Sequence, residues 1–224
     1  MLNPIKYLYH NVLPLNLKRE IDQWRFPNLN PKNAYFPYFD QTKTIFVHIP
    51  KTAGTSISQA LYKEQPKHHP LKIYKNLDSE RFENYFKFAF VRSPYDRLYS
   101  TYRYARKISH PVYRGPLSDI AKYDSFEQFV FEWCDRQKIS EHYFLKAQVD
   151  YLSLGGDSID VDFVGKFENL QEDFNRLCKL IGIDATLPVS NVSTSDSERK
   201  SAYTTEMKNK ISDIYKLDFE LFDY

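Results

Sequence analysis

The chain has 224 residues, of which 42% are hydrophobic and 17% aromatic, which suits one domain whose core uses Phe and Tyr as much as Leu and Val. Its 31 basic and 29 acidic residues leave a net charge of +2, which argues against a general nucleic-acid coat protein, so no nucleic-acid partner is expected. Its two cysteines make no disulfide framework, and no apolar run approaches the ~20 residues of a transmembrane segment, so we expect a cytoplasmic protein.

Residues 1–43 contain five prolines among aromatic residues. We expect an irregular arm there, with one helical piece near Leu15–Trp24. Aromatic side chains such as Trp24 and Phe36 favour burial, so the arm is expected to pack on the domain instead of being disordered. The domain itself is predicted to span residues 44–224.

An apolar, β-branched run over Thr44–Ile49 predicts a buried parallel strand. The chain then turns through Pro50–Gly54 and enters a predicted helix over residues 55–61, whose apolar residues fit one helix face. Such a turn binds phosphate, because the first N–H groups of a helix have no intrahelical partner and the helix dipole is positive there. Lys51 adds a full charge, and Gly54 would let the backbone come close to a ligand.

A basic, polar stretch follows at residues 63–75 and contains His68-His69-Pro70. A short helix is predicted near Asp78–Tyr85. The apolar run Phe86–Val91 then predicts a second buried strand.

The second strand ends at Arg92, directly before a predicted helix. Ser93 is a good N-cap, and Pro94 fits the first position of a helix that should run to about Lys107. Ligands bind at the carboxyl ends of strands in open α/β sheets. We therefore expect the Lys51 turn and Arg92 to lie at the same edge of the sheet.

The rest of the chain predicts helices with one strand among them. The predicted helices lie over residues 125–136, near 141–149, over 170–181 and over 204–215, and the predicted strand lies over 160–167. The first of these helices should begin with a capping box at Ser125–Gln128, and Gly182 should follow the end of the third. Together these elements predict an α/β fold with a short central parallel sheet flanked by helices.

The loop differs from that of a P-loop NTPase, which carries G-x-x-x-x-G-K-[ST]. Here the first glycine is missing, and Lys51 precedes Gly54 instead of following it. No strand ends in an obvious aspartate for Mg²⁺. The sequence therefore predicts a P-loop-like, three-layer domain that binds phosphate without a metal.

Three blocks of sequence resemble the carbohydrate sulfotransferases that use 3′-phosphoadenosine 5′-phosphosulfate (PAPS). Residues 48–56, HIPKTAGTS, resemble the 5′-phosphosulfate loop of that family, and residues 88–100, FAFVRSPYDRLYS, resemble its 3′-phosphate motif. Residues 161–170 resemble a third block. The resemblance covers roughly residues 44–215 and implies PAPS as sulfate donor, adenosine 3′,5′-bisphosphate as product and no metal.

The resemblance also assigns roles to individual residues. The 5′-phosphosulfate would be held by Lys51, Thr52, Ala53, Gly54, Thr55 and Ser56. The 3′-phosphate would be held by Arg92, which can form two parallel hydrogen bonds, and by Ser100. Arg199 and Lys200 resemble the basic lid over the 3′-phosphate, with a solvated charge pair as an equal alternative. Lys51 would also stabilise the leaving phosphate.

A histidine is the natural base for an acceptor hydroxyl near neutral pH. Related enzymes place a catalytic histidine between the two phosphate motifs, and His68 and His69 are the only histidines in that interval. We rank His68 first and His69 second. His48 falls inside the first predicted strand, where a satisfied core histidine is the preferred interpretation.

The sequence thus predicts a sulfotransferase that moves a sulfuryl group from PAPS to a hydroxyl of a carbohydrate or glycolipid. Any membrane association would be peripheral, through the acceptor. Two alternatives stay open: a nucleotide-dependent kinase of a small molecule or sugar, and a non-catalytic module that binds glycan or nucleotide on the same fold.

Overall fold

A computed structural model describes residues 34–64, 67–108, 115–155, 157–188 and 202–224. Its centre is a parallel sheet of three strands in the order β1 (Thr44–Val47), β2 (Phe86–Val91) and β3 (Phe163–Lys166). Phe46 on β1 pairs with Phe88 on β2, which pairs with Phe163 on β3. The carboxyl ends of all three strands therefore meet at one edge of the sheet.

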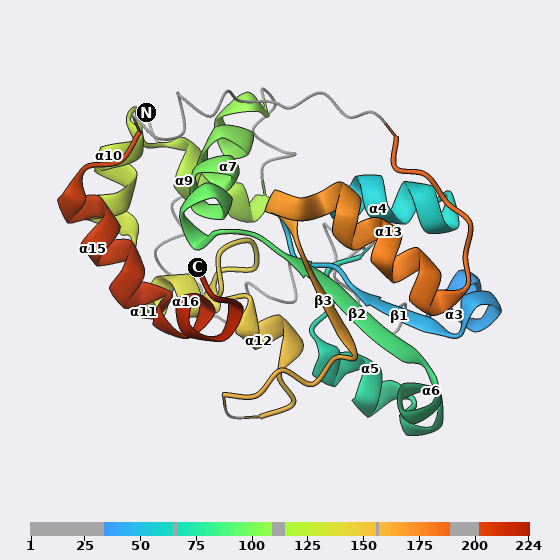
Figure 1. Cartoon of the computed structure of the whole chain (residues 1–224). Helices are drawn as coiled ribbons and strands as arrows, with labels where there is room; N and C mark the ends of the chain where they lie inside the picture. Colours follow the sequence, from blue (N-terminus) through green and yellow to red (C-terminus); the bar gives the residue numbers. More distant parts are fainter. Residues whose placement is uncertain (1–33, 65–66, 109–114, 156, 189–201) are drawn as a thin grey trace.

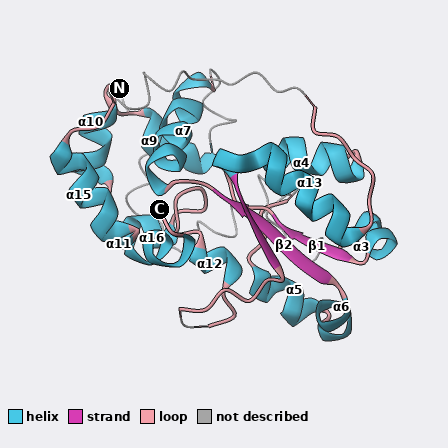
Figure 2. Ribbon diagram, in the orientation of Figure 1, coloured by secondary structure: helices cyan, strands magenta, loops and turns pink. Residues whose placement is uncertain are grey.

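Helices cover both faces of this sheet (Figures 1 and 2). One face carries α4 (Gly54–Tyr62) and α13 (Leu170–Ile181), and the other carries α5 (Leu71–Leu77), α6 (Ser79–Asn84) and α12 (Val149–Leu152). The predicted α/β class, with a short parallel sheet flanked by helices, is confirmed. The basic stretch was predicted without a helix, but it forms α5, which buries Leu71 and Tyr74 one turn apart.

The described part of the N-terminal arm packs against the sheet. Its helix α3 (Pro37–Thr42) buries Tyr38 and Phe39, and the Tyr38 ring stacks on Tyr62 with centroids 4.5 Å apart. The predicted helix near Leu15–Trp24 lies outside the described residues.

A second hydrophobic cluster lies beside the carboxyl ends of the strands, apart from the cluster around the sheet (Figure 1). It is built mainly by α7 (Pro94–Lys107), α9 (Ser118–Ala121), α10 (Phe126–Gln128), a π turn (Phe129–Trp133), α11 (Arg136–Glu141) and α15 (Thr205–Ile214). Helix α16 (Lys216–Phe222) lies between the two clusters. Short 3₁₀ turns occur at Gly115–Leu117 and Phe167–Asn169.

Several helix boundaries follow local signals. Helix α7 has its predicted bounds, although the Ser93 side chain makes no capping hydrogen bond. The predicted capping box is present, since Ser125 and Gln128 bond to each other's backbone N–H. Gly182 ends α13 in the left-handed conformation with φ of 68°.

Two predicted elements are wrong in extent, and one helix was not predicted. The helix predicted over 125–136 stops at Trp133, and a new helix begins at Arg136, capped by the Asp135 carboxylate at 2.8 Å from the Lys138 N–H. Strand β3 begins at Phe163 instead of residue 160, because the Asp160 carboxylate turns back to accept from the Leu154 N–H at 2.7 Å. The helix predicted over 204–215 is confirmed as α15, whereas α16, which follows it, was not predicted.

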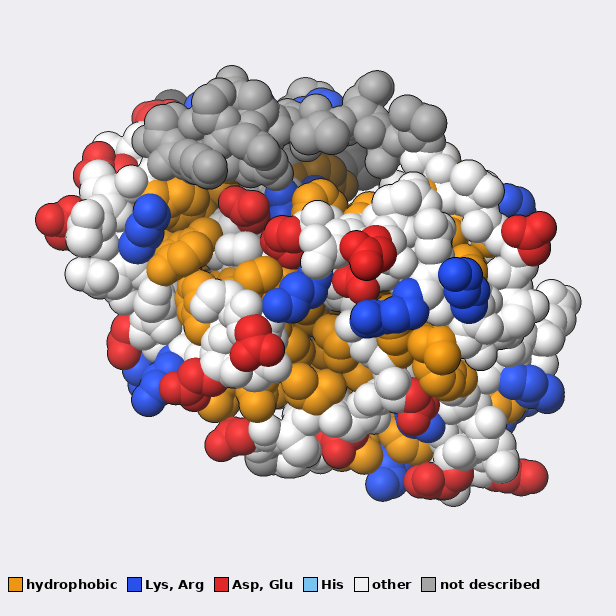
Figure 3. Space-filling view, in the orientation of Figure 1, with side chains coloured by type: hydrophobic (Ala, Val, Ile, Leu, Met, Phe, Trp, Pro, Cys, Tyr) orange, Lys and Arg blue, Asp and Glu red, His pale blue; other side chains and the backbone are white. Residues whose placement is uncertain are grey.

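The distribution of charge on the surface agrees with the nearly equal numbers of acidic and basic residues. Acidic and basic side chains are interspersed on the face shown in Figure 3, with no field of one sign. No helix within the described ranges is both long and apolar enough to cross a membrane.

Candidate active site

The turn after β1 is held in an unusual backbone conformation. Lys51 and Ala53 both have positive φ, at 71° and 66°, and α4 begins at the next residue, Gly54. The Thr52 hydroxyl donates to the Ile49 carbonyl at 3.0 Å and is fully buried, so this side chain holds the turn instead of facing a ligand. Thr52 would therefore contribute only its backbone N–H to phosphate binding.

A glycine is needed at position 54 because the His48 side chain lies against it. A Cβ added at Gly54 would lie 1.8 Å from His48 Cδ2, because the His48 ring packs directly on the glycine backbone. We expected this glycine to admit a ligand, but the close approach in the structure is that of His48. Thr55 and Ser56 stay accessible on the first turn of α4.

Arg92 follows β2 and contacts the Lys51 turn. Its Nη1 donates to the Lys51 carbonyl at 3.3 Å, and its guanidinium lies 4.0 Å from the centre of the Phe167 ring. The side-chain amide of Gln148 pairs with the Arg92 backbone, accepting from its N–H at 2.9 Å and donating to its carbonyl at 2.8 Å. The structure therefore brings the two predicted phosphate corners together.

The first turn of α7 is braced by Glu168. One carboxylate oxygen of Glu168 accepts from the Ser93 N–H at 2.9 Å, and the other accepts from the Tyr224 hydroxyl at 2.8 Å. Glu168 thus supports the Arg92 corner instead of the Lys51 turn. Ser100 lies on α7, partly exposed. Its contact with a 3′-phosphate stays a prediction.

Lys51 stands in a strongly positive environment. Burial, together with the charges of Arg92 and Lys107, lowers the pKa of Lys51 to about 8. Its ammonium lies 4.0 Å from the centre of the Tyr104 ring, a cation–π contact that favours the charged form. This crowding of positive charge is what an anionic ligand would relieve.

The His68 ring is oriented by a backbone carbonyl. Its Nδ1 lies 3.0 Å from the His48 carbonyl. A carbonyl can only accept, so Nδ1 carries the proton and Nε2 keeps its lone pair. Burial lowers the pKa of His68 to about 4, so the ring is neutral at pH 7 and its Nε2 lone pair is not already protonated.

The other two histidines are more deeply buried. His69 is only 3% exposed, and its ring packs edge-on against Tyr74 in the core at 6.3 Å. His48 lies beyond the end of β1, and its ring lies 3.8 Å from that of His68. His48 is buried as expected, but its Nδ1 has no hydrogen-bond partner among the described residues, so it is not a satisfied core histidine.

Sequence reasoning missed two aromatic side chains beside His68. Tyr143 and Phe144 lie in an irregular segment where a helix was predicted, with ring centroids 5.6 and 6.2 Å from that of His68. Arg97, buried in α7, donates to the carbonyls of residues 144, 145 and 146 at 2.7–3.3 Å and so takes the place of the helical hydrogen bonds. The sequence carries no local signal for this long-range bracing.

Residues 35–224 match the sequence profile of a family described as the sulfotransferase family. The chain belongs to this family. The predicted resemblance to sulfotransferases is thereby confirmed.

The curated relatives that the chain matches include carbohydrate sulfotransferases. Carbohydrate sulfotransferase 11 of Rattus norvegicus is 29% identical over 175 residues, which cover 65% of this chain and 49% of the relative. Carbohydrate sulfotransferase 9 of Homo sapiens is 29% identical over 195 residues, covering 70% of this chain and 43% of the relative. The chain thus spans about half the length of the relatives it matches. No solved structure matches it significantly.

The structure does not describe every residue of the predicted site. Arg199 and Lys200, the predicted lid, lie outside the described residues. No cluster of three or more His, Cys, Asp or Glu side chains that could hold a metal occurs within the part of the chain that the structure describes.

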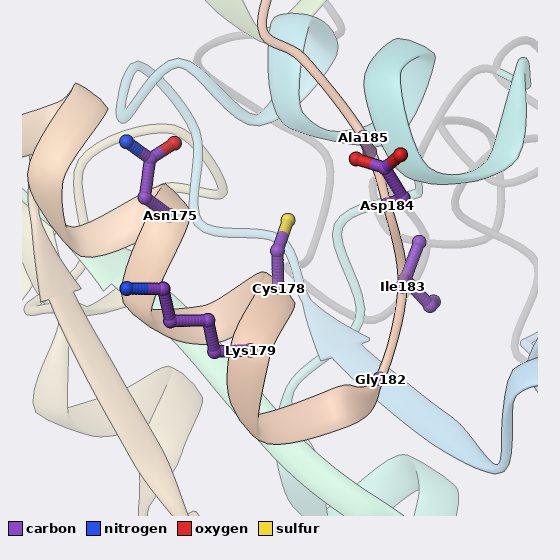
Figure 4. A pocket seen from close by; sticks show the side chains of 7 residues that line it. All are labelled: Asn175, Cys178, Lys179, Gly182, Ile183, Asp184 and Ala185. Atoms are coloured by element: carbon purple, nitrogen blue, oxygen red, sulfur yellow. The ribbon is translucent and has the colours of Figure 1, made fainter.

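An open depression of about 480 Å³ lies at the end of α13 (Figure 4). Its lining comes from the last turns of that helix and the chain after it: Asn175, Cys178, Lys179, Gly182, Ile183, Asp184 and Ala185. Helix α13 starts after the carboxyl end of β3 and runs back along the sheet, so this depression lies at the opposite edge from Lys51 and Arg92 (Figure 1). It contains none of the predicted site residues.

Proposed function

We propose that this chain transfers a sulfuryl group from PAPS to a hydroxyl group of a carbohydrate, on a P-loop-like fold. The observation that carries the proposal is the contact between the two phosphate corners, where Arg92 Nη1 reaches the Lys51 carbonyl at 3.3 Å. A ligand with phosphates at two separate positions fits such a pair of corners. The similarity to carbohydrate sulfotransferases supports a carbohydrate acceptor.

The chain's own groups fit this cofactor. Burial lowers the pKa of Lys51, and the nearby charges of Arg92 and Lys107 lower it further, so an anion placed there would be bound favourably. The 5′ end of PAPS would be held by Lys51 and the first-turn N–H groups of α4, and its 3′-phosphate by Arg92 and Ser100. When bound, PAPS supplies the sulfuryl group on a phosphate leaving group.

Two residues would act on the reacting atoms. His68 Nε2 would accept the proton of the acceptor hydroxyl, with the ring oriented by the bond from Nδ1 to the His48 carbonyl. The Lys51 ammonium would balance the charge that develops on the leaving phosphate oxygen. Neither role needs a metal ion.

A thermal-shift comparison tests the cofactor. Adenosine 3′,5′-bisphosphate should stabilise the protein more than ATP or ADP do at equal concentration, because only the first carries the 3′-phosphate that Arg92 is proposed to bind. Arg92→Ala should weaken its binding by about 2–5 kcal/mol, the cost of removing one partner of a buried charge pair. Arg136→Ala, at an exposed arginine paired with Asp213, is the matched control.

The same preparation separates the alternatives. Radiolabelled sulfate should pass from PAPS to a glycan with excess EDTA present, whereas a kinase would prefer ATP and require Mg²⁺. A non-catalytic module would bind the bisphosphate but transfer nothing to any glycan. A glycolipid acceptor and a cytoplasmic location are separate proposals, tested by sulfation of glycolipid vesicles and by cell fractionation.

A further inference from the structure

An exposed aromatic side chain lies at the proposed site without a role in either hydrophobic cluster. Tyr104, on α7, is 40% exposed, and its ring is covered by the Lys51 ammonium at 4.0 Å. Its ring centroid lies 6.5 Å from that of Phe144, whose own centroid lies 6.2 Å from that of His68. Tyr104 and Phe144 therefore lie between Lys51, the proposed stabiliser of the leaving phosphate, and His68, the proposed base.

We propose that Tyr104 and Phe144 form the subsite for the acceptor, and that they stack against the C–H face of a pyranose ring. This inference rests on the proposed function. The face of an aromatic ring is electron-rich and attracts the weakly positive C–H groups of a sugar. A pyranose lying on this aromatic wall of Tyr104 and Phe144 would present its hydroxyl edge toward His68.

The wall is fixed before any ligand binds. The Phe144 carbonyl accepts from Arg97 Nη1 at 3.3 Å, and Arg97 itself is 2% exposed. Tyr104 lies in a regular helix, one turn after Ser100. Such rigid support lets a flat hydrophobic surface bind a sugar without first paying the entropy of ordering a loop.

Lys51 makes the subsite depend on the cofactor. Its ammonium covers the Tyr104 ring in this structure, and it must leave that ring to reach a phosphosulfate. The same Tyr104 face then becomes free for the sugar. Cofactor binding should therefore strengthen acceptor binding, by about two- to fivefold if the exposed cation–π contact is what competes.

Saturation-transfer NMR tests the wall with methyl β-glycosides of glucose, galactose, N-acetylglucosamine and N-acetylgalactosamine. With adenosine 3′,5′-bisphosphate bound, we expect saturation on one C–H face of the sugar and tighter binding than without it. Tyr104→Ala should raise the acceptor KM about three- to tenfold in transfer from PAPS and remove the effect of the bisphosphate. Tyr104→Phe should retain both.

Phe131→Ala is the matched control, because Phe131 is 42% exposed and has the Lys210 ammonium 5.7 Å from its ring centre. It should change neither the acceptor KM nor the bisphosphate affinity. An unchanged acceptor KM in Tyr104→Ala would overturn the proposal, and so would an equal loss of bisphosphate affinity in that variant. If the bisphosphate binds but no glycoside binds or accepts sulfate, the pyranose subsite is wrong. If the bisphosphate itself does not bind, the proposed function is wrong as well.

Discussion

The ammonium of Lys51 carries the most direct pH signature of the site. Its pKa is lowered to about 8 by burial and by Arg92 and Lys107, and a bound phosphate dianion would raise that pKa again. Binding above pH 8 must then take up a proton. The affinity for adenosine 3′,5′-bisphosphate should accordingly stay level from pH 7 to 8 and fall by up to about tenfold per pH unit above it.

Isothermal titration between pH 7 and 10 measures this slope. Lys51→Arg is the control, since a guanidinium stays charged over the whole range and should give a flat profile. A wild-type profile as flat as that of Lys51→Arg would show that Lys51 does not bind the phosphates.

The two adjacent histidines should separate turnover from stability. His68→Ala removes the proposed base and should lower kcat by about 10²–10⁴ while bisphosphate affinity stays intact. His69→Ala removes a ring packed on Tyr74 in the core, so it should cost about 1–3 kcal/mol of unfolding free energy and leave most of kcat. Steady-state kinetics and urea unfolding of both variants measure the two effects. The reverse pattern would make His69 the base.

At the scale of elements, the turn between β1 and α4 is fitted to one side chain. Gly54→Ala would place a methyl group 1.8 Å from His48 Cδ2, so the ring must move and the turn should lose about 1–3 kcal/mol of stability, together with much of kcat. The double variant Gly54→Ala, His48→Ala should recover most of the lost stability, because the two changes share one contact.

Gly155→Ala is the control for this cycle, because an added Cβ meets nothing within 4 Å there. Its unfolding free energy in urea should match that of the wild type within about 0.5 kcal/mol. Additive losses in the double variant would mean that the glycine serves something other than the His48 ring.

Elements with strong local signals were predicted well. Strand β2 and helix α7 have their predicted bounds, because an apolar run and a proline at the first helical position are readable from a few residues. The segment around Phe144 was predicted as a helix and is irregular, because Arg97 satisfies its carbonyls from a distant helix. Helix α16 was missed because its buried contacts, such as those of Asp218, come from chain 70 residues away.

The candidate site likewise contains residues that local sequence signals predict and residues that only the packing of the fold brings together. Lys51, Arg92 and His68 could be predicted as site residues, because a phosphate turn and a histidine between two motifs can be recognised along the chain. Tyr104 and Phe144 could not be found, because their proximity to His68 depends on how α7 and the irregular segment pack. His48 was assigned to the strand, and only the fold shows its ring on Gly54 and beside His68.

At the scale of the whole molecule, Asp218 connects α16 to the site. Its carboxylate is fully buried and accepts from the N–H groups of Gln148 and Val149 at 2.8 and 3.0 Å, and Gln148 in turn holds the Arg92 backbone. Asp218→Asn would turn an amide N–H toward a backbone N–H. It should therefore lower the unfolding free energy by about 1–3 kcal/mol and also weaken bisphosphate binding.

Urea unfolding and isothermal titration measure the two effects of Asp218→Asn. Asp213→Asn is the control, because Asp213 is exposed and pairs with Arg136 on the surface, so it should change neither quantity. A loss of stability without any loss of bisphosphate affinity would mean that α16 does not support the site.

The side-chain amide of Gln148 acts as a substitute peptide group. It offers Arg92 the acceptor and the donor that a neighbouring strand would offer, and Glu168 then takes the next N–H, that of Ser93. Pro94 has no N–H to satisfy. The chain thus passes from strand to helix with its amide hydrogens occupied by side chains instead of water. In hydrogen–deuterium exchange, the amides of Arg92 and Ser93 should be protected as strongly as those inside β2. Gln148→Ala should increase the exchange rate of the Arg92 amide more than that of the Ser93 amide.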